Sequence, residues 1–210
     1  MPATSASTHP VNSTRDRLLD AALELFATRG FQAIGLRDLA SHVGLHAGSL
    51  YHHIENKQSL LFELIESALS DLLSDTMNRM RGARSPDKRL HLFIQAFATF
   101  NLNEKYKLIL ITREFANLDE EQKLWIVELK NRYSSLLSGV LADHYRKEGK
   151  PPDDVCMTTN TIILMLFGQS HWYATEATES QLVKTLTTLV TSIISYSKII
   201  EGHLTLQSDY

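Results

Sequence analysis

The chain has 210 residues and little of what builds disulfide scaffolds, turn-rich sheets or membrane spans. Its single cysteine, Cys156, excludes a disulfide within the chain and fits a reducing compartment. The five prolines and nine glycines lie mostly between apolar periodic stretches, which favours long helices over a sheet with many turns. No stretch of 18 uncharged apolar residues occurs, so we predict no membrane association and expect a cytoplasmic protein.

An excess of positive charge is also missing. The formal net charge is −3, and within residues 1–57 five basic residues are balanced by five acidic ones. Phosphate contacts normally supply much of the affinity for DNA, so the charge balance by itself does not indicate a nucleic-acid partner. Five of the nine histidines do lie in this segment, and their partial protonation near neutral pH would add positive charge.

Motifs of common catalytic sites are absent as well. The sequence has no Gly-x-Ser-x-Gly motif, no glycine-rich phosphate loop and no Cys-x-x-Cys pair. His42 and His46 have the i, i+4 spacing of metal ligands, but Gly44 interrupts the helix that would align the two rings. We therefore predict that the protein is not an enzyme and binds neither a metal ion nor a cofactor.

Apolar residues at helical spacing run along most of the sequence. With 43% hydrophobic and 21% charged residues, the composition is ordinary for a globular protein with a core. Capping residues mark helix starts at Ser13 or Thr14, at Ser85 before a proline, and at Asp119 with Gln122 three positions later. No strand-like alternation persists, so we predict an all-α fold.

The stretch from Leu36 to Ile54 is the most informative part of the sequence. Apolar residues of two short amphipathic helices flank Gly44, whose conformational freedom suits a tight turn between them. This pattern predicts a helix-turn-helix, whose second helix enters a major groove with its N-terminal residues nearest the bases. A helical hairpin without a DNA role has the same pattern, so the spacing alone leaves both interpretations open.

The segment from Thr14 to about Leu64 contains a combination of positions that is more specific than any one of them. These positions are 17–26, Arg29 to Phe31, Arg37 to Ala40, Val43 to Leu45, Gly48 to Tyr51, His53, Lys57 and Leu60. In them the segment resembles the DNA-binding domain of the TetR family of bacterial regulators. The resemblance implies a dimeric, all-α transcription regulator of about nine helices, most commonly a repressor. We accordingly divide the chain into an arm (1–12), a helix-turn-helix domain (13–58) and a ligand-sensing and dimerisation domain (59–210).

The same resemblance assigns DNA contacts to individual residues. Arg37 and Lys57 would bind phosphate groups, and Tyr51 would give its hydroxyl to a phosphate while its ring packs inward. Gly48 would permit a close approach to the duplex, and the phosphate contacts would only position the helix that reads the bases. The expected DNA-contacting set is Arg37, His46, Ala47, Gly48, Ser49, Tyr51, His52 and Lys57.

The sequence departs from the family pattern at four of these or neighbouring positions. Ile34 and Gly35 stand where the family usually has Thr or Ser, whose hydroxyl caps the second helix and can meet a phosphate. His46 replaces the usual Ser and Ala47 a frequent Lys, so the groove-facing surface has less fixed charge.

The remaining helices are expected to sense a ligand and to form a homodimer. In the resembling family the last two helices make a four-helix dimer interface, which corresponds here to about 153–175 and 179–203. The middle helices would enclose an effector, and the stretch 166–173 loosely resembles members that sense fatty acyl-coenzyme A. We therefore expect acyl-coenzyme A or another apolar ligand as the effector. The candidate ligand-binding residues are His91, Phe97, Arg113, Trp125, His171 and Trp172.

The sequence thus predicts a ligand-responsive regulator that binds double-stranded operator DNA. The alternative is a helical ligand-binding or interaction module without DNA binding, which the neutral charge of the N-terminal segment favours.

Overall fold

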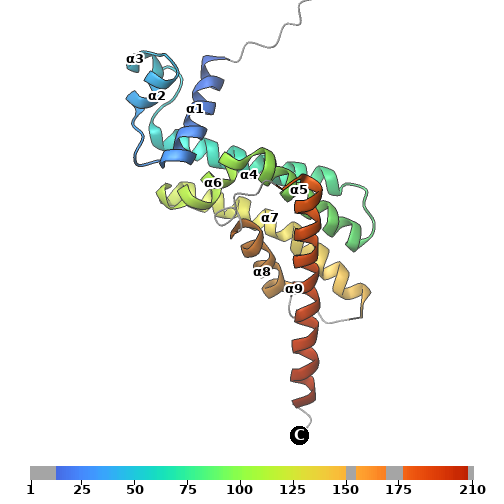
Figure 1. Cartoon of the computed structure of the whole chain (residues 1–210). Coiled ribbons are helices and arrows are strands. Elements are labelled where there is room, and N and C mark those ends of the chain that lie inside the picture. The colour runs from blue at the N-terminus through green and yellow to red at the C-terminus, as the bar shows by residue number, and fades with distance from the viewer. Residues whose placement is uncertain (1–12, 150–154, 169–176, 208–210) are drawn as a thin grey trace, which may run out of the picture. The chain divides into compact units, whose positions relative to one another are not determined.

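The computed structural model describes residues 13–149, 155–168 and 177–207, and all the regular elements in these ranges are helices (Figure 1). The chain divides into two compact units, Met1–Leu64 and Ile65–Tyr210. The predicted all-α fold is confirmed, with nine α-helices in the described part of the chain. None of the helices described is both long and apolar enough to cross a membrane.

The first unit is built from three helices and the start of a fourth. They are α1 (Thr14–Arg29), α2 (Leu36–His42), α3 (Ala47–Leu50) and α4 (Lys57–Met80), which continues into the second unit. The buried side chains include Leu18, Ala22, Leu25, Phe26, Leu39, Ala40, Leu50 and Ile54.

The first helix has the capped ends that the sequence predicts. The Ser13 hydroxyl accepts a hydrogen bond from the Asp16 N–H (3.1 Å), and the Asp16 carboxylate accepts one from the Ser13 N–H (2.9 Å). This reciprocal capping box satisfies N–H groups that the helix leaves without partners. Gly30 ends the helix at φ +90°, a conformation that glycine adopts without strain.

A Schellman turn joins α2 to α3. Gly44 has φ +72°, and its N–H donates to the Ser41 carbonyl (3.2 Å), while the Leu45 N–H reaches back to the Ala40 carbonyl (2.8 Å). These two bonds satisfy carbonyls at the end of α2 and reverse the chain within a few residues. Gly44 is therefore the residue that allows the chain to turn between the end of α2 and the start of α3 in only four residues.

The second unit is a helical bundle. In it α5 packs against α7 and α9, α7 packs against α8, and α8 packs against α9. Its largest fully buried side chains include Phe93 and Phe97 of α5. The elements after α4 are α5 (Pro86–Asn103), α6 (Lys105–Ile109), a π-helical turn η1 (Leu110–Glu114), a 3-10 turn η2 (Phe115–Asn117), α7 (Glu120–Lys147), α8 (Val155–Gly168) and α9 (Glu179–Gln207).

Both predicted caps in this unit are confirmed. The Ser85 hydroxyl accepts a hydrogen bond from the Lys88 N–H (3.2 Å), so α5 begins where the sequence predicts. The Asp119 carboxylate accepts from the Gln122 N–H (2.9 Å), and the Gln122 side chain accepts from the Asp119 N–H (3.3 Å). Local chemistry therefore sets the starts of α5 and α7.

Three segments differ from the predicted helix pattern. The third helix ends at Leu50 and gives way to a turn at residues 51–53, whereas we expected helix up to about Ile54. The apolar stretch from residue 106 to 115 is divided among α6, the π turn and the start of the 3-10 turn. Of the expected helix 153–175, α8 covers Val155–Gly168, and residues 153–154 and 169–175 lie outside the described part.

Candidate nucleic-acid interface and ligand cavity

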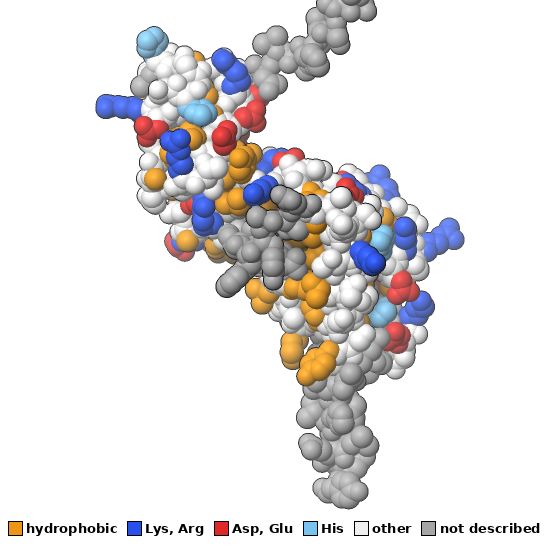
Figure 2. Space-filling model, viewed as in Figure 1, with side chains coloured by type: hydrophobic (Ala, Val, Ile, Leu, Met, Phe, Trp, Pro, Cys, Tyr) orange, Lys and Arg blue, Asp and Glu red, His pale blue; other side chains and the backbone are white. Residues whose placement is uncertain are grey.

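The outward side of α3 has few bulky side chains. His46, which precedes the helix, and His52, which follows it, are exposed, as is Gly48, whereas Ser49 is half-buried. In Figure 2, histidine and basic side chains stand out on the surface of the first unit among acidic ones. The side chain of Ala47 lies outside the described part of the structure. Four of the predicted DNA-contacting positions thus lie together on or beside one short helix.

Buried leucines hold this face in place. Leu50 of α3 and Leu39 of α2 are completely buried, and Ala40 is small where the two helices meet. His46 makes no side-chain capping bond at the start of α3, so its ring is not committed to the helix end. The opposite, outward side of α3 therefore remains available to a partner.

Tyr51 differs from our expectation. We predicted that its ring packs inward, but the side chain is 61% exposed because α3 ends one residue earlier and Tyr51 starts the following turn. The inward packing is wrong, whereas the phosphate contact of the hydroxyl stays a prediction. A more exposed ring also offers apolar surface to the sugar–phosphate backbone.

The two predicted phosphate-binding cations have different surroundings. Arg37 is exposed on the first turn of α2. The Lys57 ammonium lies 4.1 Å from the centre of the Phe31 ring, and the residue is half-buried. A cation above an aromatic face is attracted to it. Lys57 therefore contributes to packing within the first unit whatever its role toward DNA.

The missing hydroxyl before α2 has a local replacement. Gly35 precedes the helix at φ −92°, and the carboxylate of Asp38 accepts a hydrogen bond from its N–H (2.8 Å). Gly35 has no side chain, so the half of the capping box that depends on a side chain before the helix is absent. Asp38 stabilises the start of α2 but cannot supply the donor that a hydroxyl would offer to a phosphate.

A further cation of the first unit is already paired. One terminal nitrogen of the Arg15 guanidinium donates to both carboxylate oxygens of Glu63, at 2.6 and 2.8 Å. This pair ties α1 to the start of α4 and leaves Arg15 less available to a phosphate.

The second unit contains a cavity of about 380 Å³, which we call the α7–α8 cavity. Its lining comes from α4, the turns η1 and η2, α7 and α8, and is mainly apolar. Its volume is at the lower end of the range of small-molecule sites, about 300 to 1,000 Å³. The apolar and aromatic lining includes Leu69, Ile111, Phe115, Tyr133, Ile163 and Phe167.

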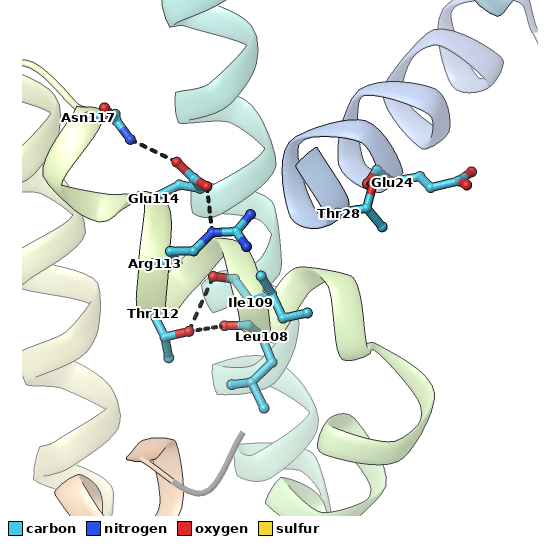
Figure 3. A network of polar contacts seen from close by, with 8 residues as sticks. All are labelled: Glu24, Thr28, Leu108, Ile109, Thr112, Arg113, Glu114 and Asn117. Carbon is cyan, nitrogen blue, oxygen red and sulfur yellow. Dashed lines mark hydrogen bonds and ion pairs between the residues drawn. The ribbon is translucent and has the colours of Figure 1, made fainter. Parts of the chain in front are cut away.

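The polar groups of the α7–α8 cavity are few. Thr112 and Ser134 contribute hydroxyls, and among the lining side chains that the structure describes Lys130 is the single charged one. Thr112 already donates to the carbonyls of Leu108 (2.9 Å) and Ile109 (3.2 Å), at the π-helical turn (Figure 3). It can therefore accept a hydrogen bond from a ligand but has no free proton to donate.

Two side chains that line this cavity, those of Lys130 and Tyr133, have shifted pKa values. Burial lowers the pKa of Lys130, whose ammonium lies 3.8 Å from the centre of the Phe115 ring. Burial also raises the pKa of Tyr133, and Asp75 raises it further. The Tyr133 hydroxyl has no partner within hydrogen-bond geometry in the described part, although it lies near Thr76. Titratable groups with perturbed pKa values are typical of functional cavities.

The predicted ligand-binding residues are not gathered at this cavity. Phe97 is buried and contacts Phe167, a lining residue, with ring centroids 5.2 Å apart. Arg113 pairs with Glu114 at 2.7 Å, and Trp125 is 55% exposed on α7. None of these three is part of the described lining, and their ligand contacts stay predictions.

The structure does not place the other three predicted ligand-binding residues at the α7–α8 cavity. His91 lines a separate, more polar hollow of about 690 Å³ between α5 and α9. His171 and Trp172 lie outside the described residues.

Sequence reasoning missed Lys130, the most distinctive polar residue of the cavity. A signal was present, because Lys130 lies one turn after Ile126 and one turn before Tyr133 on the same face of α7. Both neighbours are buried, and a lysine within an apolar stripe is unusual because burying an unpaired charge is costly.

An outward-facing second helix of a helix-turn-helix, joined to a helical unit with an apolar cavity, defines a DNA-binding transcription regulator with a sensor domain. Comparison with known families agrees. A model described as bacterial regulatory proteins of the tetR family matches residues 18–64, and one described as the tetracyclin repressor-like C-terminal domain matches residues 83–194. The chain belongs to the TetR family.

Individual relatives support the same class. The transcriptional repressor KstR2 of Mycobacterium tuberculosis is 27% identical over 166 residues, which cover 78% of this chain and 82% of that one. KstR2 of Rhodococcus jostii is 41% identical over 71 residues, 34% of this chain and 35% of that one. The predicted class, a transcription regulator rather than an enzyme, is confirmed by family membership.

Solved structures share the fold. The M. tuberculosis KstR2 structure, described as a ketosteroid transcriptional regulator, superposes with a TM-score of 0.77 at 25% identity and covers 86% of this chain and 94% of that one. AibR in complex with isovaleryl coenzyme A and operator DNA gives a TM-score of 0.76 at 20% identity, covering 84% and 97%. The match over the helix-turn-helix favours DNA binding over the alternative of an interaction module.

Proposed function

We propose that this regulator is a repressor that leaves its operator when a small apolar molecule binds in the α7–α8 cavity. The observation that carries the proposal is the presence, in one chain, of an exposed α3 face and a mainly apolar cavity of small-molecule size. The relatives KstR2 and IcaR are named as a repressor and a negative regulator, which supports repression.

In this proposal the DNA contacts come from the outward side of α3 with its flanking residues, and from Arg37 of α2 and Lys57 of α4. The exposed Arg37, with Lys57 and the Tyr51 hydroxyl, binds phosphates and fixes the register on the duplex. His46, Ser49 and His52 meet base edges or phosphates, and the absence of side chain bulk at Ala47 and Gly48 permits close approach. Because fixed positive charge is scarce, base contacts carry more of the affinity than in a strongly basic domain.

The effector is apolar over most of its surface. Leu69, Ile163 and Phe167 offer hydrocarbon and aromatic walls but no hydrogen-bonding groups. KstR2 is described as a ketosteroid regulator, and a steroid is a molecule of this apolar kind. An acyl-coenzyme A fits the cavity through its acyl part only, because about 380 Å³ does not hold the nucleotide as well.

Two copies of the chain are needed, because one short recognition helix reads only one half-site. We place the dimer contact on α8 and α9, which expose side chains in two stripes at i, i+4, i+7 and i+11 spacing. The stripes are Met157, Thr161, Leu164 and Gly168 on α8, and Thr185, Leu189, Ser192 and Tyr196 on α9.

Helix α4 is the element that transmits the ligand's effect. It starts within the first unit at Lys57 and contributes Leu69 to the cavity wall. A ligand that binds more tightly to one position of α4 shifts the equilibrium between DNA-binding and non-binding forms. Leu164 belongs to both the cavity lining and the α8 stripe, so a partner chain on α8 borders the same cavity.

A salt-dependent titration of the gene's own upstream duplex, followed by fluorescence anisotropy, tests the DNA-binding half of this proposal. We expect binding that weakens with salt, and for Arg37→Ala a slope of log K against log salt that is smaller by about 1. The matched control is Arg84→Ala, an exposed arginine of the second unit, which should leave the slope unchanged. Absence of binding even at low salt would contradict the proposal.

The dimer is tested in the same titration. The double variant Leu189→Asp with Tyr196→Asp should be monomeric by light scattering and lose most of its DNA affinity, because charges do not fit an apolar interface. Leu124→Asp introduces a charge at an exposed leucine of α7 and should remain dimeric.

A further inference from the structure

We infer that the ligand of the α7–α8 cavity is an apolar carboxylic acid, whose carboxylate binds the ammonium group of Lys130. The inference rests on the proposed function of this cavity and adds the chemical class of its ligand.

The first observation is an imbalance of charge in the cavity. Among the described residues, the lining contains one cation, Lys130, and no carboxylate. In the part of the chain that the structure describes, the Lys130 ammonium forms no ion pair, and its recorded contact is the face of the Phe115 ring at 3.8 Å. Lys130 is half-buried, and charges that are withdrawn from water in proteins are normally paired, so a ligand anion in the cavity would supply the partner.

Lys107 of the same unit shows the usual arrangement for comparison. Its ammonium lies 3.0 Å from the Asp71 carboxylate and 3.3 Å from that of Glu104. Burial alone would lower the pKa of Lys107, but the two carboxylates raise it above its ordinary value. Lys130 is also desolvated, yet no carboxylate offsets the burial, and its pKa is lowered.

The nearest buried carboxylate along the chain does not complete the site. Glu114 belongs to the π-helical turn that gives Ile111 and Thr112 to the cavity lining, and it is only 4% exposed. Its two oxygens accept hydrogen bonds from Arg113 and from Asn117, both at 2.7 Å (Figure 3). This acid is satisfied by its own neighbours, which leaves Lys130 for an external anion.

The remaining lining selects the rest of the ligand. Seven apolar or aromatic side chains of the described lining surround the space, so the part of the molecule beyond the carboxylate is hydrocarbon, linear or cyclic. Thr112, whose proton is already donated to backbone carbonyls, offers only an acceptor. A π-helical turn at the edge of the cavity fits this picture, because such turns occur frequently at functional sites.

Isothermal titration calorimetry with matched pairs of acid and primary amide tests the inference. The probes are decanoate and 4-cyclohexylbutanoate, each compared with its own uncharged amide. We expect each acid that binds to do so about ten-fold or more tightly than its amide, since a charge-assisted hydrogen bond is lost in the amide.

Three variants assign the effect to Lys130. Lys130→Met should weaken the acids to the level of the amides and leave the amides unchanged, whereas Lys130→Arg should retain the preference for acids. The matched control is Lys123→Met, on the same helix but outside the lining, where the ammonium pairs with Glu120 at 2.9 Å. Circular dichroism of each variant verifies that the fold is retained.

Equal affinity of acids and amides, an unchanged acid affinity in Lys130→Met, or failure of both acids to bind would overturn the inference. A different result would contradict the proposed function. A neutral compound that binds the cavity and releases DNA would support the repressor mechanism and overturn only the inference that the ligand is a carboxylic acid.

Discussion

Gly35 is one of the residues at which this chain departs from the pattern that the family resemblance implies. A hydroxyl residue is usual at this position, and here the Asp38 carboxylate alone satisfies the Gly35 N–H. The φ of −92° accepts any side chain, and an added Cβ would lie 3.2 Å from a terminal oxygen of Asp38, which can shift. The position can therefore accept a serine side chain.

Gly35→Ser should accordingly improve both stability and DNA binding. We expect the free energy of unfolding to rise by a few tenths of a kcal/mol, roughly the difference between glycine and serine as helix caps. The added hydroxyl should tighten operator binding by roughly two- to ten-fold, the effect of about one new hydrogen bond. Urea denaturation and fluorescence anisotropy measure the two effects.

Gly35→Ala is the control for this change, since it adds the Cβ without the hydroxyl. If the alanine variant bound DNA as tightly as the serine variant, the gain would not come from a phosphate contact.

For individual residues, the sequence predicted interactions between near neighbours and missed those between residues that are distant along the chain. Asp119 and Gln122 are three residues apart, so their spacing alone was sufficient to predict the pair. At the first helix the sequence left Ser13 and Thr14 open, and the structure uses Ser13. The exposure of Tyr51 and the contact of Lys57 with Phe31 depend on tertiary packing, which a spacing rule does not contain. Lys130 was missed for the same reason.

Among the elements, the turn between α2 and α3 has the strictest requirement. Gly44 needs φ +72°, a left-handed conformation that costs a residue with a Cβ about 1–2 kcal/mol. No atom lies within 4 Å of a Cβ built there, so the whole cost comes from the backbone.

Two glycine-to-alanine changes should therefore have opposite effects on stability. Gly44→Ala should lower the free energy of unfolding by about 1–2 kcal/mol. Gly48→Ala, within α3 and equally open, should raise it by about 0.5–1 kcal/mol because alanine favours the helix. Denaturation curves followed by circular dichroism measure both, and shifts in the same direction would contradict the assignment of Gly44 to the turn.

The helices themselves were largely predictable, because apolar periodicity and caps mark them. The π-helical turn was not, since it requires the backbone to change its hydrogen-bond register within an apolar segment. Two sets of contacts stabilise this turn. The Thr112 hydroxyl donates hydrogen bonds to the carbonyls of Leu108 and Ile109, and the Glu114 carboxylate accepts one from Asn117. These contacts form only once the chain is folded, although the turn brings two residues into the cavity lining.

For the whole molecule, the sequence supported the class of protein better than the details of its sites. The helix-turn-helix spans fewer than fifty matched residues, 18–64, in which spacing and turn chemistry are local. The cavity instead combines residues from α4 to α8, such as Leu69 and Phe167, that are far apart in sequence. Candidates chosen there for residue type alone, such as Trp125, lie at the surface instead.

The central claim is that ligand binding in the second unit and DNA binding in the first are linked equilibria. Linkage requires the ligand to weaken DNA binding by the same factor by which DNA weakens ligand binding. Typical coupling factors lie between about 5 and 150.

The most direct measurement determines four dissociation constants for one cavity-binding compound. Two are the dissociation constants of the upstream duplex, measured with and without saturating compound. The other two are those of the compound, measured with and without saturating duplex. We predict that both ratios exceed about 5 and agree with each other. The variants Lys130→Met and the cavity-filling Ser134→Phe show whether a compound binds in the cavity, because they weaken its binding if it does. Such a cavity-binding compound that leaves the affinity for DNA unchanged would contradict the account.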